Sequence, residues 1–206
     1  MAYLKGFADT CKSPFASYIA VTNLPTESDY IDTYKAVASR LQASLPGSKL
    51  TTDLNNRLMQ LEKMSKISVG GDAPDIQMQS PDGKTYKLSD LHGKIVLLDF
   101  WASWCGPCRK ENPTVVAAYD KYKDKGFTIF SVSLDKAKEN WQKAIEQDKL
   151  AWPYHVSDLQ HWQSAAAQLY GVQSIPASFL IDKDGKIIAK NLRGPALESK
   201  LAEVLK

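Results

Sequence analysis

Two cysteines that stand two residues apart, Cys105 and Cys108, constrain this chain more than any other feature of its sequence. The run from Lys94 to Trp101 leads into them, and its almost continuous apolar character is typical of a buried strand. Pro107 lies between the cysteines, and proline favours the first turn of a helix. The sequence therefore predicts a strand, a short turn and a helix that begins at the cysteine pair.

A cysteine pair of this spacing can be structural, bind a metal or take part in redox chemistry. At the amino terminus of a helix, free N–H groups and the helix dipole would stabilise the thiolate of Cys105. Cys108 would lie one turn further on the same face, close enough to form a reversible disulfide. We expect Cys105 to attack a substrate disulfide and Cys108 to resolve the mixed disulfide that results.

The two other interpretations of the pair are weaker. Structural zinc usually has four ligands, and the three histidines of the chain are dispersed, with none at ligand spacing beside the cysteines. A purely structural disulfide would close so short a loop that it would stabilise the fold little. The sequence therefore favours redox chemistry without a metal, and without any cofactor other than the Cys105–Cys108 disulfide itself.

Composition excludes several classes of protein. Apolar residues make up 44% of the chain and charged residues 24%, which is ordinary for a folded soluble protein. The net charge is +3 and the basic residues are scattered, so no nucleic-acid surface is indicated. No apolar run approaches the roughly 20 residues that cross a membrane. Met1 to Phe15 lacks the apolar core of a secretory signal, so the protein is either cytosolic or shown without its signal. Cys11 is interpreted as an ordinary half-buried residue, with a reactive thiol as the alternative.

Residues 1–67 are expected to form α-helices, because apolar side chains recur there three and four positions apart. Pro25 to Asp29 has the capping and acidic residues of a helix start, and Leu45 to Ser48 would end that helix. Thr51 to Asp53 would cap a further helix, and a shorter one is expected around Ser13 to Ala20. Such helices need a partner surface, since short isolated helices are marginal in water.

A glycine-containing hinge, Ser68 to Pro74, separates this helical part from the rest. Hairpins are expected around Pro81 to Gly83 and Asp182 to Gly185, and strands otherwise alternate with helices. This alternation predicts an α/β sheet covered on both faces. We therefore expect two parts, an α-helical region 1–67 and a redox domain 68–206.

The residues around the cysteines resemble a known family. Asp99 to Cys108 is similar to the active-site strand and turn of the thioredoxin superfamily. Three further motifs narrow the resemblance to the bacterial TlpA/ResA-like thiol–disulfide oxidoreductases: GGDAPD at 70–75, LSDLHGK at 88–94 and CRKENP at 108–113. The resemblance covers about residues 69–206. It implies a thioredoxin fold, with a central mixed β-sheet flanked by helices, an added amino-terminal β-hairpin and an inserted segment after the second central strand. It leaves open that the helical region is the remnant of a larger upstream part.

Two carboxylates gain roles from the resemblance. Asp99 lies in an apolar run, where desolvation should raise its pKa, and it would help to deprotonate Cys108 through water. Glu111 matches a glutamate that the family keeps near its cysteines. The alternatives are that Asp99 points to solvent at the end of the strand and that Glu111 only favours the helix start. The presence of both leaves open which carboxylate tunes the thiols.

Substrate would bind beside the cysteines. Ile175–Pro176 resembles the loop with the family's cis-proline, whose main chain would pair with an extended peptide. Trp104 and Pro107 would form an exposed apolar rim. Gly194 resembles a glycine that leaves room for the partner, and a helix start is its alternative explanation. The predicted substrate-binding residues are Trp104, Gly106, Pro107, Ile175, Pro176 and Gly194.

An aromatic patch in the inserted segment comprises Trp152 to His155 together with His161 and Trp162. We expect most of it to be packing, with a surface for docking a partner as the alternative.

The Gly-Pro pair between the cysteines resembles that of the reducing thioredoxins. The resemblance therefore implies a reductase of protein disulfides, for example in cytochrome c maturation, in the periplasm or cell envelope. It also implies an upstream thiol electron donor, expected in the membrane. A disulfide oxidase or isomerase, or an interaction module with secondary redox activity, remains the alternative. A peroxidase is disfavoured, because no Pro-x-x-x-Thr stretch precedes a cysteine.

Overall fold

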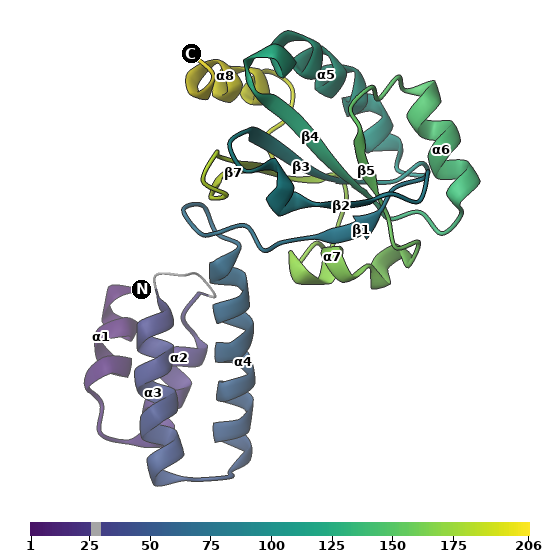
Figure 1. The fold of residues 1–206 in the computed structure, drawn as a ribbon. Helices are drawn as coiled ribbons and strands as arrows, with labels where there is room; N and C mark the ends of the chain where they lie inside the picture. The colour runs from purple at the N-terminus through teal and green to yellow at the C-terminus, as the bar shows by residue number, and fades with distance from the viewer. Residues whose placement is uncertain (26–29) are drawn as a thin grey trace. The chain divides into compact units, whose positions relative to one another are not determined.

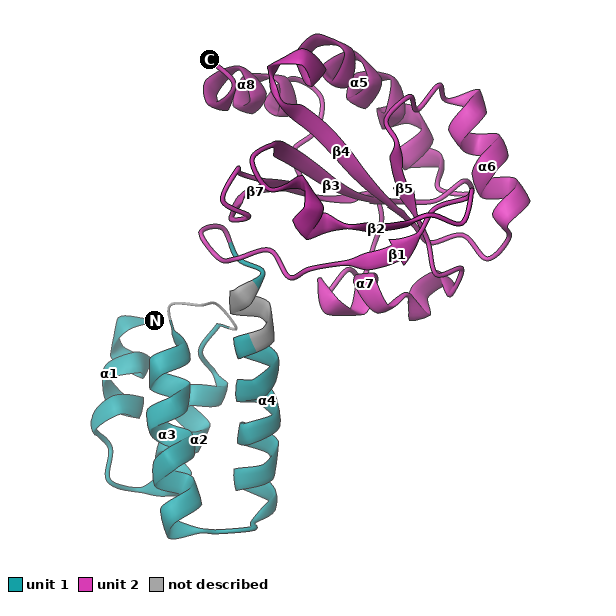
Figure 2. Ribbon diagram, in the orientation of Figure 1, with its two compact units in different colours: residues 1–68 teal, residues 69–206 magenta. Residues whose placement is uncertain are grey.

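The computed structural model describes residues 1–25 and 30–206, except for the side chains of residues 63–66. It divides into two compact units, Met1–Ser68 and Val69–Lys206 (Figure 2). The division lies one residue beyond the boundary expected from the sequence. Within the described ranges, no helix combines the length and apolar character needed to cross a membrane.

The first unit is built from helices. In the described residues these are α1 (Ala2–Thr10), α2 (Pro14–Thr22), α3 (Ile31–Ser44) and α4 (Lys49–Lys66) (Figure 1). Tyr34, Val37 and Leu41 of α3 recur at helical spacing and are fully buried, as the apolar stripe predicts. They pack in one cluster with Leu54 of α4, so each helix has the partner surface that its apolar face requires.

The start of α4 differs from the prediction. The hydroxyl oxygen of Ser48, rather than a side chain of Thr51 to Asp53, accepts a hydrogen bond from the backbone N–H of Thr51 at 3.2 Å. Thr51 is buried in the first turn, so the helix begins at Lys49, ahead of the expected cap. Of the cap expected at Pro25 to Asp29, residues 26–29 lie outside the described residues.

Helix α1 lies within the region predicted to be helical, but the sequence analysis gave it no bounds of its own. It has no acidic residue in its first turn and no side-chain cap at its start, so no local signal marks it. Its carboxyl end is held from α3, where the Arg40 guanidinium donates to the carbonyl oxygens of Ala8, Asp9 and Cys11. Cys11 is a partly buried free cysteine, as expected.

The second unit contains a five-stranded sheet of order β5-β4-β3-β6-β7. Its strands are β3 (Ile95–Trp101), β4 (Phe127–Ser133), β5 (Tyr154–Val156), β6 (Ala177–Ile181) and β7 (Ile187–Lys190). Strand β3 is parallel to β4 and antiparallel to β6, so the sheet is mixed. Every residue of β3 and β4 is buried, which confirms the buried strand predicted from the apolar run.

Helices cover both faces of this sheet. They are α5 (Gly106–Tyr122), α6 (Lys138–Gln147), α7 (Ala165–Leu169) and α8 (Pro195–Val204). Helices α5 and α8 lie on one face, and α7 lies on the other (Figure 1). The hairpin of β1 (Gln77–Gln79) and β2 (Thr85–Lys87) precedes the sheet, and α6, β5 and α7 lie between β4 and β6 in the sequence. This is the mixed sheet with an added hairpin and an inserted segment that the resemblance implies.

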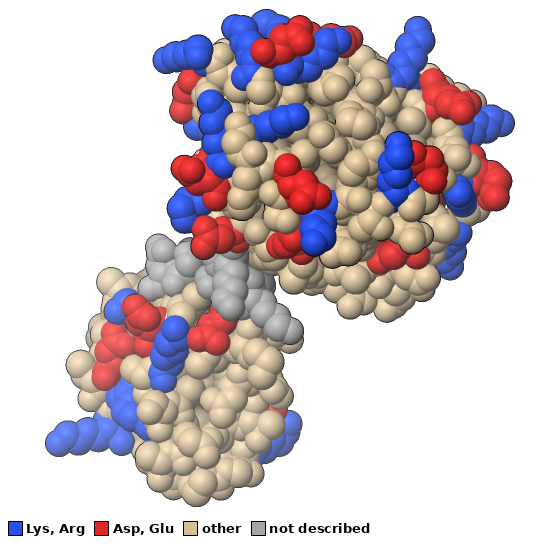
Figure 3. All heavy atoms as spheres, in the orientation of Figure 1, with Lys and Arg blue, Asp and Glu red and all other residues tan. Residues whose placement is uncertain are grey.

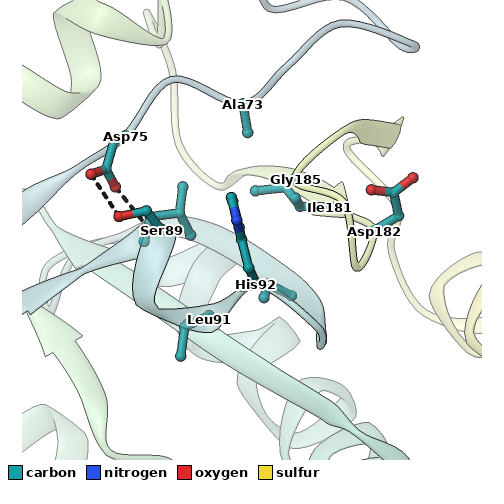
Figure 4. Close-up of a pocket in the computed structure, with 10 residues that line it drawn as sticks. Ala73, Asp75, Ser89, Leu91, His92, Ile181, Asp182 and Gly185 are labelled. Atoms are coloured by element: carbon teal, nitrogen blue, oxygen red, sulfur yellow. Dashed lines mark hydrogen bonds between the residues drawn. The ribbon is translucent and has the colours of Figure 1, made fainter.

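A small pocket lies near Val96, at the amino end of β3 (Figure 4). The Asp75 carboxylate there accepts hydrogen bonds from the backbone N–H and the hydroxyl of Ser89, at 2.9 and 2.8 Å. The ring of His92 fills the space beside Gly185, whose φ is +84°, and a Cβ at Gly185 would lie 2.8 Å from His92 Nε2. The pocket is thus a packed junction, at the end of β3 opposite the cysteine pair.

On the face shown in Figure 3, lysines and arginines are interspersed with aspartates and glutamates. This agrees with the scattered basic residues of the sequence.

Candidate active site

The cysteine pair lies at the start of α5. Cys105 is the residue that caps the helix, and its sulfur accepts from the backbone N–H of Cys108 at 3.2 Å. The two sulfurs are joined in a disulfide, and the Cα atoms lie 5.3 Å apart. Both cysteines are buried, whereas Gly106 and Pro107 between them are exposed. The predicted helix start is confirmed, so a thiolate formed here on reduction would face the free N–H groups and the dipole of α5.

The loop before the pair is held by Asp135, which follows β4 and is 1% exposed. Its carboxylate accepts from the backbone N–H of Ser103 at 2.9 Å, from the Ser103 hydroxyl, and from the Ser133 hydroxyl at 2.7 Å. The sequence analysis did not single out Asp135. Its place two residues after a buried parallel strand is the signal that could have found it, because sites in α/β sheets gather at the carboxyl ends of the strands.

Asp99 lies in the middle of β3 and is 7% exposed, so it does not point to solvent. Burial raises the pKa of its carboxyl to about 7, against the opposing positive charge of Arg193, and the negative charge of Glu111 adds to the rise. A carboxyl with a pKa near neutrality can both accept and release a proton under ordinary conditions.

Glu111 lies in the second turn of α5 and is half-buried. Its carboxylate accepts a hydrogen bond from the backbone N–H of Gly194 at 2.8 Å. Gly194 caps α8 with φ +47° and ψ −129°, a conformation that essentially only glycine adopts. The interpretation of Gly194 as a helix start is therefore confirmed, and its backbone also meets the carboxylate beside the cysteines.

The Ile175–Pro176 peptide bond is cis. Because Phe100 pairs with Ala177 in the sheet, Pro176 lies at the edge where β3 ends, which is also the edge where the cysteine loop begins. Ile175 and Pro176 are both partly exposed there. The structure therefore brings this loop and the cysteine pair to the same edge of the sheet.

Arg193 is a site residue that the sequence analysis missed. Its guanidinium donates to the carbonyl oxygen of Pro176, and its charge acts on the pKa of Asp99. An arginine beside the predicted Gly194 was the available signal. It becomes informative only once the fold brings this segment next to β3 and β6.

Arg109, which follows Cys108, joins α5 to the end of α6. Its guanidinium forms a two-pronged ion pair with Asp148, with one contact at 2.7 Å, and donates to the carbonyl oxygen of Ser103 at 3.1 Å. Asn112 donates to the same Asp148 carboxylate at 2.6 Å. This network fixes the first turns of α5 against the inserted segment.

The structure divides the aromatic patch into two. Trp152 and His155 are buried and stacked with ring centroids 5.3 Å apart, and burial lowers the pKa of His155 to about 4. They are packing, as expected. His161 and Trp162 lie instead beside Trp104, at centroid distances of 4.9 and 6.1 Å from its ring. Trp104 is 48% exposed, which confirms its predicted place on an exposed rim.

A mixed sheet with a disulfide at the start of the helix after its central strand defines a thioredoxin-like redox protein. In the part of the chain that the structure describes, no cluster of three or more His, Cys, Asp or Glu side chains could hold a metal ion. The Cys105–Cys108 disulfide at the start of α5 supports exchange of a disulfide for two thiols.

Comparison with known proteins identifies the family. The model of the AhpC/TSA family matches residues 69–190. Thiol-disulfide oxidoreductase ResA of Bacillus thuringiensis subsp. konkukian is 36% identical over 144 residues, which are 70% of this chain and 80% of the relative. ResA of Bacillus subtilis is 32% identical over 139 residues, covering 68% and 75% of the two chains.

Solved structures agree with this. The thioredoxin domain of a thiol-disulfide oxidoreductase from Bacteroides vulgatus is 39% identical, with a TM-score of 0.64 over 68% of this chain and 99% of that one. A putative thiol:disulfide interchange protein DsbE from Chlorobium tepidum is 37% identical, with a TM-score of 0.61 over 68% and 99%. The chain belongs to the AhpC/TSA family and, within it, to the ResA-like thiol–disulfide oxidoreductases. It is a thioredoxin-like oxidoreductase with the fold that the sequence predicted.

Proposed function

We propose that this protein reduces disulfide bonds in other proteins, with Cys105 and Cys108 as its reacting pair. The observation that supports this most directly is the disulfide at the start of α5, with the exposed Gly106–Pro107 turn beside it. The reactive group is the disulfide itself, and no further cofactor is needed for the exchange.

The exchange has two steps. In the dithiol form, the Cys105 thiolate attacks one sulfur of the substrate disulfide, which releases one substrate thiolate and leaves a mixed disulfide. The Cys108 thiolate then attacks the Cys105 sulfur, which breaks the mixed disulfide and releases the second substrate thiolate. Two electrons pass to the substrate, the two thiol protons end on its sulfurs, and the protein is left as the disulfide. A thiol electron donor must then reduce it again.

Asp99 is the proposed proton acceptor for Cys108, since its pKa of about 7 lets it take a proton near neutral pH. Glu111 is proposed to tune the same site through its charge, which raises the pKa of Asp99. The two carboxylates thus have different roles: Asp99 transfers the proton, and the charge of Glu111 adjusts the pKa of Asp99.

Substrate is proposed to lie along the exposed surface between the cysteine turn and the cis-proline loop. An extended peptide would pair with the main chain of Ile175, beside Pro176, while Trp104, Gly106 and Pro107 contact it from the other side. Gly194 is proposed to leave room for the substrate beside this loop, and its hydrogen bond to Glu111 supports a position near the cysteine helix.

The setting we propose is the periplasm or cell envelope, where disulfides form and need correction. The resemblance to relatives named ResA and DsbE supports this setting. Oxidised cysteines of apocytochromes awaiting haem are the proposed substrates, and a membrane-borne thiol protein is the proposed donor. Donation of disulfides is the second candidate function, because the same pair can run in either direction.

The reduction potential of the Cys105–Cys108 pair separates these directions. The purified protein is equilibrated in graded dithiol and disulfide buffers and its free thiols are trapped, with Cys108→Ser as the control that removes the titrating pair. A reduction potential of about −270 mV supports the proposed function as a reductase. A reduction potential of about −120 mV contradicts the reductase function and supports disulfide donation.

A further inference from the structure

We propose that Trp104, His161 and Trp162, here called the aromatic cluster, bind an aromatic or long aliphatic side chain next to the reacting cysteine of the substrate. The inference rests on the proposed function and adds a substrate preference to it, for disulfides within apolar segments of polypeptide. The argument comes from the exposure of Trp104 and Trp162, the way the three rings are held, and their place beside Cys105.

The rings form one contiguous surface. The rings of Trp104 and His161 are stacked with centroids 4.9 Å apart, and Trp162 meets Trp104 edge-on at 6.1 Å and His161 edge-on at 5.9 Å. Trp104 and Trp162 nevertheless remain 48% and 37% exposed. Neighbouring exposed tryptophans are uncommon on a surface without a binding role, and tryptophan is enriched among residues that dominate binding.

The loop that presents His161 and Trp162 is built by its own hydrogen bonds. The Asp158 carboxylate accepts from the backbone N–H of Gln160 at 3.1 Å and of Ala165 at 2.8 Å. His161 has φ +54°, a left-handed conformation that is costly for a residue with a Cβ. The loop therefore positions the His161 ring against Trp104 with a backbone conformation that is uncommon for a residue with a Cβ.

Both sides of the cluster are attached to the end of β4. Ser157, before the aromatic loop, donates to the Ser133 carbonyl oxygen at 2.8 Å. The Ser133 hydroxyl donates to Asp135, which in turn holds Ser103, the residue before Trp104. The rings are therefore positioned before any substrate arrives, which lowers the entropy lost on binding.

The position of the cluster defines its occupant. Trp104 directly precedes Cys105, so a substrate cysteine that reacts with Cys105 brings its own neighbours to the cluster. Successive residues of an extended peptide lie about 3.3 Å apart, so a side chain one or two positions from the cysteine reaches the rings. Three rings offer far less area than the roughly 800 Å² per partner of a stable protein interface, which favours a single side chain as the occupant.

Peptide pairs test this. Two peptides of identical sequence, each with one glutathionylated cysteine, differ only in whether phenylalanine or serine occupies the neighbouring positions. The reduced protein is mixed with each peptide, and the rate at which the disulfide between peptide and glutathione disappears is measured under single-turnover conditions. Bis(2-hydroxyethyl) disulfide, which has no side chain to bind, measures the exchange chemistry alone. We expect the natural protein to favour the phenylalanine peptide about tenfold.

Variants locate the preference. Trp162→Ala should reduce this ratio to about one, and His161→Asn should reduce it as well, because asparagine tolerates a positive φ but removes the ring. Leu169→Ala is the matched control: it removes an apolar side chain that is 44% exposed on α7, and the ratio should stay as in the natural protein. Circular dichroism checks that each variant is folded.

The outcomes separate the inference from the proposed function. Equal rates for both peptides in the natural protein, or an unchanged ratio in folded Trp162→Ala and His161→Asn, would overturn the aromatic cluster as a binding surface while reduction of the small disulfide still supports the function. If the protein reduces none of the three disulfides, both the aromatic cluster as a binding surface and the proposed function are overturned.

Discussion

The carboxylate of Glu111 accepts a hydrogen bond from the backbone N–H of Gly194, at 2.8 Å and across 83 positions of the sequence. This contact ties the helix of the cysteines to the start of α8. Arg193, the adjacent residue, donates to the carbonyl oxygen of Pro176. One short segment therefore meets both the active-site helix and the cis-proline loop. Two opposite charges act on Asp99, that of Arg193 in this segment and that of Glu111 in α5.

Asp99→Asn should stabilise the fold by an amount that grows with pH. The pKa of Asp99 is about 7 in the folded protein and about 3.9 in an unfolded chain. Between these values the folded protein holds a proton that the unfolded chain releases, so the stability of the natural protein falls as the pH rises to about 7. Below about pH 3.9 both states are protonated and the effect is absent.

The size of this effect can be bounded. The two pKa values differ by about three units, which corresponds to at most about 4 kcal/mol. Urea unfolding of the disulfide form at about pH 4, 6 and 8 measures the free energy of unfolding of both proteins. The advantage of asparagine should increase from the first pH to the last, and an advantage independent of pH would contradict the buried neutral carboxyl.

Arg193→Gln and Glu111→Gln should shift the pKa of Asp99 in opposite directions. Loss of the Arg193 charge raises it, because that charge stabilises the carboxylate, and loss of the Glu111 charge lowers it. Glutamine at 111 still offers an oxygen to the N–H of Gly194, so the second variant tests charge rather than structure. A pH titration of the Asp99 carboxyl carbon by NMR measures both, and shifts of the same sign would contradict this electrostatic account.

Much of the second unit could be predicted from the sequence because local physics determines it. A strand buried on both faces must be apolar almost throughout, so β3 was evident, and Asp99 stood out as its one charged residue. The turn residues at 182–185 predicted the hairpin, and the Asp182 carboxylate does accept from the N–H groups of Asp184 and Lys186. Pro107 predicted that a helix begins at the cysteine pair, because proline favours the first turn of a helix.

What could not be predicted depends on partners far apart in the sequence. Asp135 contacts Ser103 from 32 positions away, and no pattern in the sequence marks such a pair. The sequence predicted that most of the aromatic patch would be packing, but it did not show which of its residues would lie beside Trp104. Positive φ angles at Leu159 and His161 turn the chain between its two halves, so that one half is buried and the other meets Trp104.

Asp148→Ala should destabilise the second unit by about 1–3 kcal/mol. The side chains of Arg109 and Asp148 are only 27% and 14% exposed. Removing the carboxylate takes away the acceptor of the Asn112 amide and the negative partner of the guanidinium, which keeps only neutral acceptors on Ser103 and Gln147. Asp148→Asn keeps an acceptor oxygen and should cost less. Urea unfolding measures both variants, and equal stability of all three proteins would show that this network contributes nothing to the fold.

Cys108→Ser should accumulate a mixed disulfide with a substrate, and Cys105→Ser should not. Cys105 caps α5 beside the exposed Gly106–Pro107 turn, and its thiolate gains from the helix amino terminus, so it should attack first. Without the Cys108 thiol the second step cannot follow, and the adduct persists. Mass spectrometry after mixing each variant with a glutathionylated peptide detects the adduct by its mass. An adduct of comparable yield on Cys108 in the Cys105→Ser variant would reverse the assigned order of the two cysteines.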